Sequence, residues 1–319
     1  MGRTESLDPD LAALLAESAA TSTDERSWSE LTVAEARERC RAELLLTSGP
    51  GDQSVTARDM AIAASRRQVP LRIYHPAASQ ASAAAPVVVY IHGGGFVLGG
   101  LDTHDAICRD MVATGGFVCV AVGYRLSPEH HFPAALDDCV ETLKWVHEHV
   151  GELSAGTARV ALAGDSAGGN LAAAACLVLR DQGLALPELQ LLIYPVVDLT
   201  MSADSTKAYG PEFGLSTEDL AWFYANYLGE DGNPADPYVS PWLATDLSGL
   251  PLSHVVTVGF DPLRDEGLGY VESLRAAGVP TSTKDYPGLI HGAFELAAVI
   301  PASRSLLEDV AHRLALPGE

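Results

Sequence analysis

Lysine is scarce in this sequence, and positive charge is scarce overall. Lysine occurs only as Lys144, Lys207 and Lys284, and 20 basic residues face 42 acidic ones, which leaves a formal net charge of −22. Such a surplus of negative charge repels phosphate backbones and anionic lipid headgroups. The composition therefore argues against nucleic acid and against a stable association with membranes.

Cysteine is also scarce, and the five cysteines form no Cys-x-x-Cys pair. Several lie in apolar patterns, which is typical of buried reduced thiols rather than of a disulfide framework or a zinc site. The sequence has no apolar run of about 18 residues and no positively charged lead before an apolar segment. We therefore expect no membrane-spanning helix and no secretory signal, and a cytoplasmic location.

Hydrophobic residues, by contrast, make up 47% of the 319 residues, enough for one domain with a sizeable core. From residue 87 onward, apolar runs alternate with longer helical patterns. Continuous apolar strands separated by helices predict an α/β fold, with a mostly parallel sheet covered by helices on both faces. The strands expected in this part are residues 87–91, 117–122, 160–163, 189–194, 254–258 and 281–286, and the last helix is expected over 294–314.

The N-terminal region has a different pattern. Residues 8–46 repeat leucine and other apolar residues at helical spacing between acidic residues. Two plausible strands follow, at 55–62 and 69–74. We therefore assign residues 1–50 to an N-terminal helical part.

A second region interrupts the alternation after the fourth apolar run. Residues 200–250 contain many turn residues around one convincing helix at 220–228, which Ser216 opens as a cap. This stretch is too long for a simple crossover in a compact domain. We therefore expect a catalytic domain over residues 51–319, with an insertion around 200–235 that lies over the sheet.

A short motif stands between an expected strand and an alanine-rich helix, and it reads Gly164-Asp165-Ser166-Ala167-Gly168. Glycines two before and two after the serine let strand and helix pack closely, so the serine can adopt a strained conformation with its oxygen exposed. The amide of Ala167 is then placed to donate to a developing oxyanion. The alternative is that Ser166 simply caps the helix.

A run of glycines directly follows the first strong strand, in the order His92-Gly93-Gly94-Gly95-Phe96. Uncovered backbone amides in such a run suit an oxyanion hole. A phosphate loop is disfavoured because no Lys-Ser/Thr follows and the spacing does not fit Gly-x-Gly-x-x-Gly. A flexible glycine turn with no chemical role is the remaining alternative.

A carboxylate and a histidine follow the last two expected strands. Asp261 comes directly after a strand, although with Pro262 behind it the aspartate could be only a helix cap. Asp265 and Glu266 lie a turn further on and would face away. His291 lies in the loop before the last helix.

The order of these residues along the chain is informative. Ser166, Asp261 and His291 are separated by intervals of 95 and 30 residues. This is the serine, acid, histidine order of the α/β-hydrolases. The three motifs together therefore support a catalytic interpretation more strongly than any one of them alone.

Together these motifs resemble the bacterial hormone-sensitive-lipase-like family (family IV) of α/β-hydrolase carboxylesterases. The matching segments lie in the family's order between residue 87 and the C-terminus, and they read His92-Gly93-Gly94-Gly95, Tyr124-Arg125-Leu126-Ser127-Pro128-Glu129-His130 with Phe132-Pro133-Ala134-Ala135, Gly164-Asp165-Ser166-Ala167-Gly168-Gly169, Asp261-Pro262-Leu263-Arg264-Asp265-Glu266 and His291-Gly292.

The resemblance implies an α/β-hydrolase fold and a carboxylic ester hydrolase. Ser166 would be the nucleophile, His291 the general base and acid, and Asp261 the residue that orients the imidazole. By the same resemblance, the amides of Gly94, Gly95 and Ala167 would form the oxyanion hole, with His92 and the 124–129 segment holding that loop.

The family likeness also implies a helical cap, built from the N-terminal helices and the insertion near 200–235. It implies no metal and no organic cofactor. One departure is Ala293, where the family commonly has a bulky aromatic residue after His-Gly. This departure leaves undetermined which residues form the pocket wall beside His291.

Candidate apolar residues of a substrate pocket are Phe96, Phe213, Leu215, Trp222 and Phe223, although the last two could be only the core of the insertion helix. A partly closed, capped pocket favours short- to medium-chain acyl esters over long-chain lipids. The expected partner is thus a small-molecule ester, and a homodimer stays open.

Two alternatives remain. The same machinery could hydrolyse an amide or formamide, or deacetylate a small molecule. A non-catalytic small-molecule receptor of related fold is less favoured, because the plant gibberellin receptors lack the triad histidine, whereas His291 is present here.

Overall fold

The computed structural model describes residues 6–21, 24, 26–64, 67–82, 84–154, 158–209 and 213–316. Its centre is an eight-stranded sheet with the strand order β1-β2-β4-β3-β5-β6-β7-β8. Strands β3 to β8 pair in parallel, while β1 and β2 pair antiparallel at one edge. The strands are β1 (Thr56–Ala64), β2 (Arg67–His75), β3 (Val87–Ile91), β4 (Val118–Val122), β5 (Val160–Asp165), β6 (Leu189–Ile193), β7 (Leu252–Phe260) and β8 (Thr281–Ile290). The predicted α/β class is confirmed.

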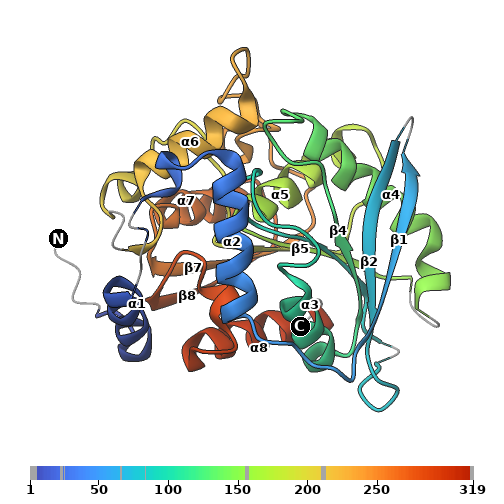
Figure 1. Cartoon of the computed structure of the whole chain (residues 1–319). Coiled ribbons are helices and arrows are strands. Elements are labelled where there is room, and N and C mark those ends of the chain that lie inside the picture. Colours follow the sequence, from blue (N-terminus) through green and yellow to red (C-terminus); the bar gives the residue numbers. More distant parts are fainter. Residues whose placement is uncertain are drawn as a thin grey trace.

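Helices cover both faces of this sheet (Figure 1). Every residue of β3, β4, β5 and β6 is buried, as expected for strands between two helical layers. The flanking helices are α3 (Asp105–Gly115), α4 (Ala134–Leu153), α5 (Ala167–Asp181), α7 (Arg264–Ala276) and α8 (Pro301–Ala315). Helices α4, α5 and α7 share one core cluster, and α3 and α8 share the cluster on the opposite face.

The N-terminal helices and the insertion contact each other. The N-terminal part contains α1 (Pro9–Thr21), the short helix η1 (Trp28–Glu30) and α2 (Val33–Thr47), and the insertion contains η2 (Asp204–Lys207) and α6 (Thr217–Leu228). The Ser29 amide in η1 donates to Asp219 of α6 over 2.9 Å. Figure 1 shows α2 standing across the sheet, with α6 above it and α8 below it.

Capping residues stand at the N-termini of α6 and α2. The Ser216 hydroxyl accepts from the Asp219 amide while Asp219 accepts from the Ser216 amide, which is a reciprocal capping box. Thr32 and Glu35 form the same arrangement at the start of α2. The helix predicted after Ser216 is therefore present.

The last helix begins later than predicted. Residues 294–314 were expected as one helix, but Ala293–Leu296 form the short helix η5 and α8 begins at Pro301. Proline has no amide hydrogen and disfavours helical geometry in the preceding residue, and Ile300 is extended with φ −116°. The expected continuous helix was wrong because Pro301 suits only a first turn.

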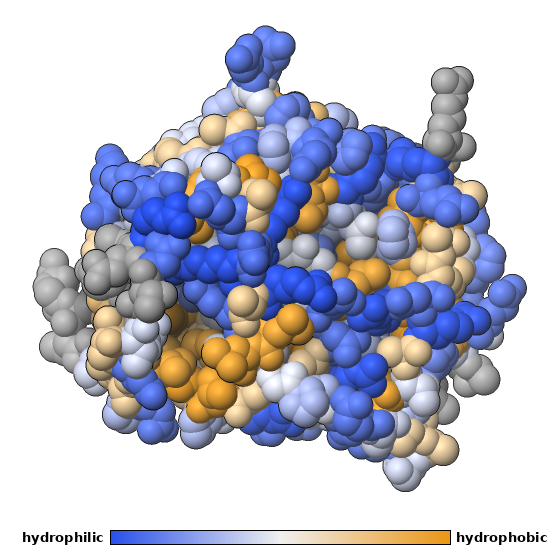
Figure 2. All heavy atoms as spheres, in the orientation of Figure 1, coloured by the Kyte–Doolittle hydropathy of each residue, from blue (hydrophilic) through white to orange (hydrophobic). Residues whose placement is uncertain are grey.

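The face shown in Figure 2 is largely polar, with hydrophobic side chains gathered below α2. The exposed large hydrophobic residues of the described part of the chain include Leu45 and Leu46 at the end of α2 and Val299 before α8. None of the described helices combines the length and the apolarity that a membrane crossing requires. All five cysteines are buried and unpaired.

Candidate active site

Ser166 occupies the sharp turn between β5 and α5. Its φ is 52°, in the left-handed region that only glycine adopts without strain, and its side chain lies at the helix N-terminus. A Cβ on Gly164 would lie 2.3 Å from the Gly168 carbonyl oxygen, and one on Gly168 would lie 2.1 Å from that of Ile91. The two glycines are therefore required for the close approach that makes this turn possible.

His291 and Asp261 reach this serine from the ends of neighbouring strands. His291 Nε2 lies 2.9 Å from Ser166 Oγ, and its Nδ1 lies 3.0 Å from Asp261 Oδ2. Asp261 is fully buried, and its other oxygen accepts the Leu263 amide over 2.8 Å. The structure thus brings the three residues predicted to form a triad into one hydrogen-bonded chain.

The charge around His291 favours its protonated form. Burial alone would lower the pKa of His291, but the charge and hydrogen bond of Asp261 outweigh burial and raise it, with further contributions from Glu295 and Asp165. The Tyr194 ring packs against the imidazole at 4.7 Å between centroids. These surroundings therefore stabilise the imidazolium that forms when Nε2 of His291 accepts a proton.

The glycine loop after β3 lies beside this chain of groups. Gly94, Gly95 and Phe96 have positive φ values of 106°, 59° and 66°. The Gly93 amide donates to Asp165 Oδ1 over 3.0 Å. The amides of Gly94, Gly95 and Ala167 donate to no other group within the part of the chain that the structure describes. These three amides are the available donors beside Ser166.

Aromatic stacking and a tyrosine hydroxyl hold the glycine loop in place. The His92 ring stacks on Tyr124 at 4.2 Å, and Tyr124 Oη donates to the His92 carbonyl over 2.9 Å. Burial, with a contribution from the charge of His104, lowers the pKa of His92 to about 3. His92 is therefore neutral and serves the loop as a packing and hydrogen-bonding group.

Helix α2 reaches the same loop from outside the sheet. Arg37 Nε donates to the Val97 carbonyl, and Nη2 donates to the Ser127 carbonyl, both over 2.9 Å. The guanidinium also pairs with Glu129 through two bonds of 2.7 Å. The N-terminal part thus contributes directly to the position of the glycine loop.

A model of the alpha/beta hydrolase fold family matches residues 88–295 of the chain. This match spans the glycine loop, Ser166, Asp261 and His291. The chain belongs to the α/β-hydrolase family. The fold class and the family resemblance predicted from the motifs are confirmed.

Characterised members of this family resemble the chain over most of its length. It is 40% identical to carboxylic ester hydrolase LipN of Mycobacterium tuberculosis, over 91% of this chain and 77% of that protein. It is 33% identical to an ethyl acetate hydrolase of Pseudomonas putida, over 92% of this chain and 94% of that protein. The solved ester-hydrolase EH1AB1 from the metagenome of Lake Arreo superposes with a TM-score of 0.91 at 34% identity, covering 98% of this chain and 99% of that one.

The predicted pocket residues do not share one environment in this α/β-hydrolase. Phe223 of α6 lies directly over the glycine loop, because a Cβ on Gly95 would meet its ring at 2.2 Å, and Trp222 packs edge-on against it. Phe213 stacks on Phe260, next to Asp261, at 5.1 Å between centroids. Of these three, Phe223 contacts the glycine loop, Trp222 packs on Phe223, and Phe213 packs on the residue before Asp261.

Phe96 and Leu215 lie in the core, as does Phe223. Phe96 is fully buried and stacks on Tyr227 of α6 at 3.8 Å. Leu215, before α6, is also buried. Ala293, two residues after His291, is buried as well.

Sequence reasoning missed three buried groups behind the site, namely His104, Tyr194 and Glu295. It also missed that Glu266 turns inward and accepts the amides of Val197 and Asp198. Glu266 lies in the motif that begins at Asp261, but it was expected to face away. His104, Tyr194 and Glu295 belong to no motif and come from different parts of the sequence, so only the three-dimensional arrangement shows them. A single polar residue among apolar neighbours in the sequence does not reveal whether its side chain is buried against a polar partner.

Proposed function

We propose that the chain hydrolyses carboxylic esters, with Ser166, His291 and Asp261 as catalytic triad. The observation on which this depends is the continuous hydrogen-bonded chain from the Ser166 hydroxyl through His291 to buried Asp261. A serine hydroxyl is a weak nucleophile at neutral pH unless an oriented base takes its proton. That base, and the carboxylate that orients it, are both in contact here.

In this mechanism Ser166 Oγ attacks the ester carbonyl while its proton passes to His291 Nε2. The negative charge on the carbonyl oxygen is stabilised by the amides of Gly94, Gly95 and Ala167, and each such donor typically lowers the barrier by about 3 kcal/mol. His291 then protonates the leaving alcohol. Water, deprotonated by the same imidazole, resolves the acyl-enzyme and restores Ser166.

The nature of the relatives supports an ester rather than an amide as substrate. Similar proteins are named carboxylic ester hydrolase, carboxylesterase and ethyl acetate hydrolase. A small ester such as ethyl acetate fits the expected preference for short- to medium-chain acyl groups. The large negative net charge further favours a neutral substrate over an anionic one.

The proposal includes a cap formed by residues 1–50 and the insertion around 200–235. Support comes from the contact between Ser29 and Asp219, which ties the two parts together, and from Phe223 against Gly95. Trp222 and Phe223 would then limit the length of the acyl chain. Exchange of Trp222 for alanine should shift the preferred ester toward longer chains, with little change in the rate on acetyl esters.

A cytoplasmic location remains a prediction from the sequence, and the sequence leaves a homodimer open. Size-exclusion chromatography with light scattering measures the oligomeric state directly. Cell fractionation of the source organism measures the location.

A panel of nitrophenyl esters from acetyl to palmitoyl tests the proposed activity. We expect turnover that is highest on the short to medium chains, loss of that turnover in Ser166→Ala, and a covalent adduct on Ser166 after treatment with an activated phosphonate. Nitroanilides of the same acids serve as the amide comparison. Absence of turnover on every ester, together with absence of an adduct on Ser166, would contradict the proposal.

A further inference from the structure

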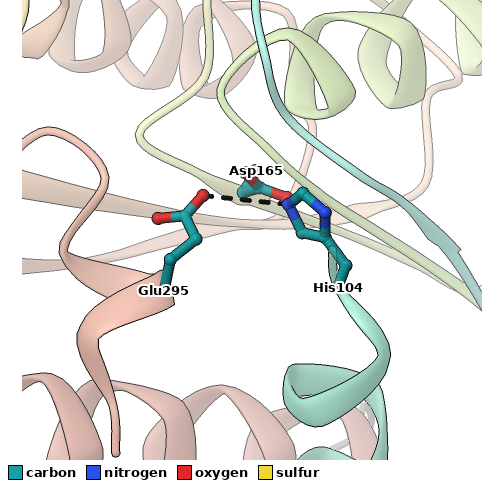
Figure 3. A group of neighbouring side chains, drawn as sticks. All are labelled: His104, Asp165 and Glu295. Atoms are coloured by element: carbon teal, nitrogen blue, oxygen red, sulfur yellow. Dashed lines mark ion pairs between the residues drawn. The ribbon is translucent and has the colours of Figure 1, made fainter. Parts of the chain in front are cut away.

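Behind the site, one buried cluster joins three separate parts of the catalytic framework. It consists of His104 before α3, Asp165 at the end of β5 and Glu295 in η5, and Figure 3 shows these side chains pointing toward one another. His104 is 3% exposed, Asp165 is 0% exposed and the Glu295 side chain is 12% exposed. Charged groups so far from solvent persist only when they are paired.

The members of the cluster contact different parts of the catalytic framework, and the His104 ring lies 5.2 Å between centroids from the ring of His92, which begins the glycine loop. Asp165 Oδ1 accepts the Gly93 amide of the glycine loop and the Tyr90 hydroxyl, over 3.0 and 2.6 Å, and Asp165 is joined by a peptide bond to Ser166. Glu295 Oε2 accepts the Tyr194 hydroxyl over 3.1 Å. The cluster therefore borders the glycine loop, the nucleophile turn and the histidine loop at once.

Tyr194 transmits the position of Glu295 to the catalytic base. Its ring packs on His291, and its hydroxyl accepts the Phe294 amide over 3.2 Å as well as donating to Glu295. Tyr194 itself has a φ of 35°, so its backbone is held in an unfavourable region by these contacts. A change at Glu295 would thus reach the imidazole through one side chain.

A single positive charge balances the cluster. His104 Nε2 lies 3.9 Å from Glu295 Oε1, and one nitrogen or oxygen from each of the three residues lies within 4.8 Å of the others. Within the described residues, His104 Nε2 and Asp165 Oδ2 have no hydrogen-bond partner. Nitrogen and oxygen ligands of a tetrahedral zinc ion lie only about 3.4 Å apart. The 3.9 Å between His104 Nε2 and Glu295 Oε1 is wider than this, and it fits an imidazolium beside a carboxylate better than two ligands of one zinc ion.

The electrostatics agree with this assignment. Burial would lower the pKa of His104, but Glu295 and Asp165 outweigh it and raise it. Burial would raise the pKa of Glu295, but His104 outweighs it and holds it below the usual value. Burial and the charge of Glu295 raise the pKa of Asp165 to about 7. These directions favour the charged forms of His104 and Glu295 and the neutral form of Asp165.

We propose that His104 and Glu295 form a buried ion pair that positions the glycine loop and the catalytic histidine for ester hydrolysis. This inference rests on the proposed function. Neither residue touches the substrate, so both are positioning residues. The charge of Glu295 also acts on His291, which is faced by Asp261, Glu295 and Asp165.

Charge-removing variants test this inference through the pH profile of kcat/KM on nitrophenyl acetate. Glu295→Gln removes a negative charge that raises the pKa of His291, so the acid limb should move to lower pH by about half a unit, and kcat should fall about tenfold with KM nearly unchanged. His104→Gln leaves Glu295 buried without its cation, and a similar fall in kcat is expected. His254→Gln is the control and should keep the wild-type profile. His254 is half-buried near the start of β7 and hydrogen-bonds to Ser282 of β8.

The double variant His104→Gln/Glu295→Gln separates an ion pair from two independent structural residues. Because no charge is then left unpaired, its kcat should be no lower than that of the slower single variant, and its loss in Tm should be smaller than the two single losses together. Additive losses in kcat and Tm, or a wild-type acid limb in Glu295→Gln, would overturn the inference. So would a stoichiometric metal in the purified protein that Glu295→Gln abolishes.

A milder substitution covers the case in which the charge variants do not fold. Tyr194→Phe keeps the ring against His291 and removes only the hydroxyl between Glu295 and Phe294, so kcat should fall about threefold at unchanged KM. An unchanged kcat would overturn the inference. If the wild-type protein itself hydrolyses no ester, the proposed function fails, while the Tm comparison still decides whether the ion pair exists.

Discussion

Asp261 determines the protonation of the proposed site more than any other side chain. It has no solvent exposure, and both of its oxygens accept hydrogen bonds, one from the backbone and one from His291. A buried carboxylate in this position fixes the imidazole tautomer that presents Nε2 to the serine. The same carboxylate raises the pKa of His291, so orientation and basicity have one source.

The pH dependence of kcat/KM follows from that raised pKa. His291 must be neutral to accept the Ser166 proton, so activity is lost as the pH falls through the pKa of His291, which lies above its ordinary value of about 6.5. Asp261→Asn should move this acid limb to lower pH and reduce kcat by about four orders of magnitude. Stopped-flow or steady-state kinetics between pH 5 and 9 (roughly the range in which histidine titrates) provide the measurement. An acid limb that stays in place in the variant would contradict the role given to Asp261.

The residues of the triad could be predicted from the sequence because each lies in a motif that directly follows a strand. The contacts that hold Ser166, Asp261 and His291 together are those that the motif order led us to expect. Their catalytic roles stay predictions until kinetics test them. His104 and Glu295 could not be predicted, since a single polar residue in an apolar pattern has the same appearance whether it faces solvent or a buried partner.

The turn between β5 and α5 depends on helix α5 approaching strands β3 and β5 more closely than side chains would allow. Gly168 lies against the Ile91 and His92 carbonyls at the end of β3, where the glycine loop begins. The strand and the helix were both predicted from their apolar patterns. The sequence indicated this close packing through the glycine spacing alone.

Gly168→Ala should therefore be destabilising. A new Cβ 2.1 Å from a backbone oxygen forces β3 and α5 apart, and we expect a loss of about 3 kcal/mol in the free energy of unfolding. Gly151→Ala in α4, where a Cβ meets nothing within 4 Å, is the matched control and should be neutral or stabilise by up to about 1 kcal/mol. Denaturant unfolding followed by circular dichroism measures both. Equal stability of the two variants would show that the tight packing at Gly168 is not needed.

Helix α2 should influence the rate although it contains no residue of the triad. Arg37→Ala removes the bonds to the Val97 and Ser127 carbonyls, which should loosen the glycine loop and lower kcat/KM by about tenfold. Arg41→Ala on the same helix removes only an exposed pair with Asp102 and is the control. Steady-state kinetics on nitrophenyl acetate compare the two. If both variants match the wild type in kcat/KM, α2 does not influence the rate through the glycine loop.

The chain as a whole places its chemistry at the carboxyl ends of β3, β5, β7 and β8. Alternating apolar strands and helices predicted this sheet, because strands buried on both faces contain almost no polar residues. The boundaries were less accurate where one residue overrides a pattern, as Pro301 does at the start of α8. The N-terminal helices were predicted, but their contacts with the insertion and with the glycine loop were not, since those contacts join residues 60 to 190 positions apart.

Trapping the acyl-enzyme tests the central claim most directly. Wild-type protein mixed with nitrophenyl acetate and quenched in acid within the first turnover should contain one acetyl group, located by peptide mass spectrometry on Ser166. Ser166→Ala should contain none and should not turn over the ester. An acetyl group on another residue that is formed and lost at the rate of turnover, or undiminished turnover in Ser166→Ala, would contradict the account.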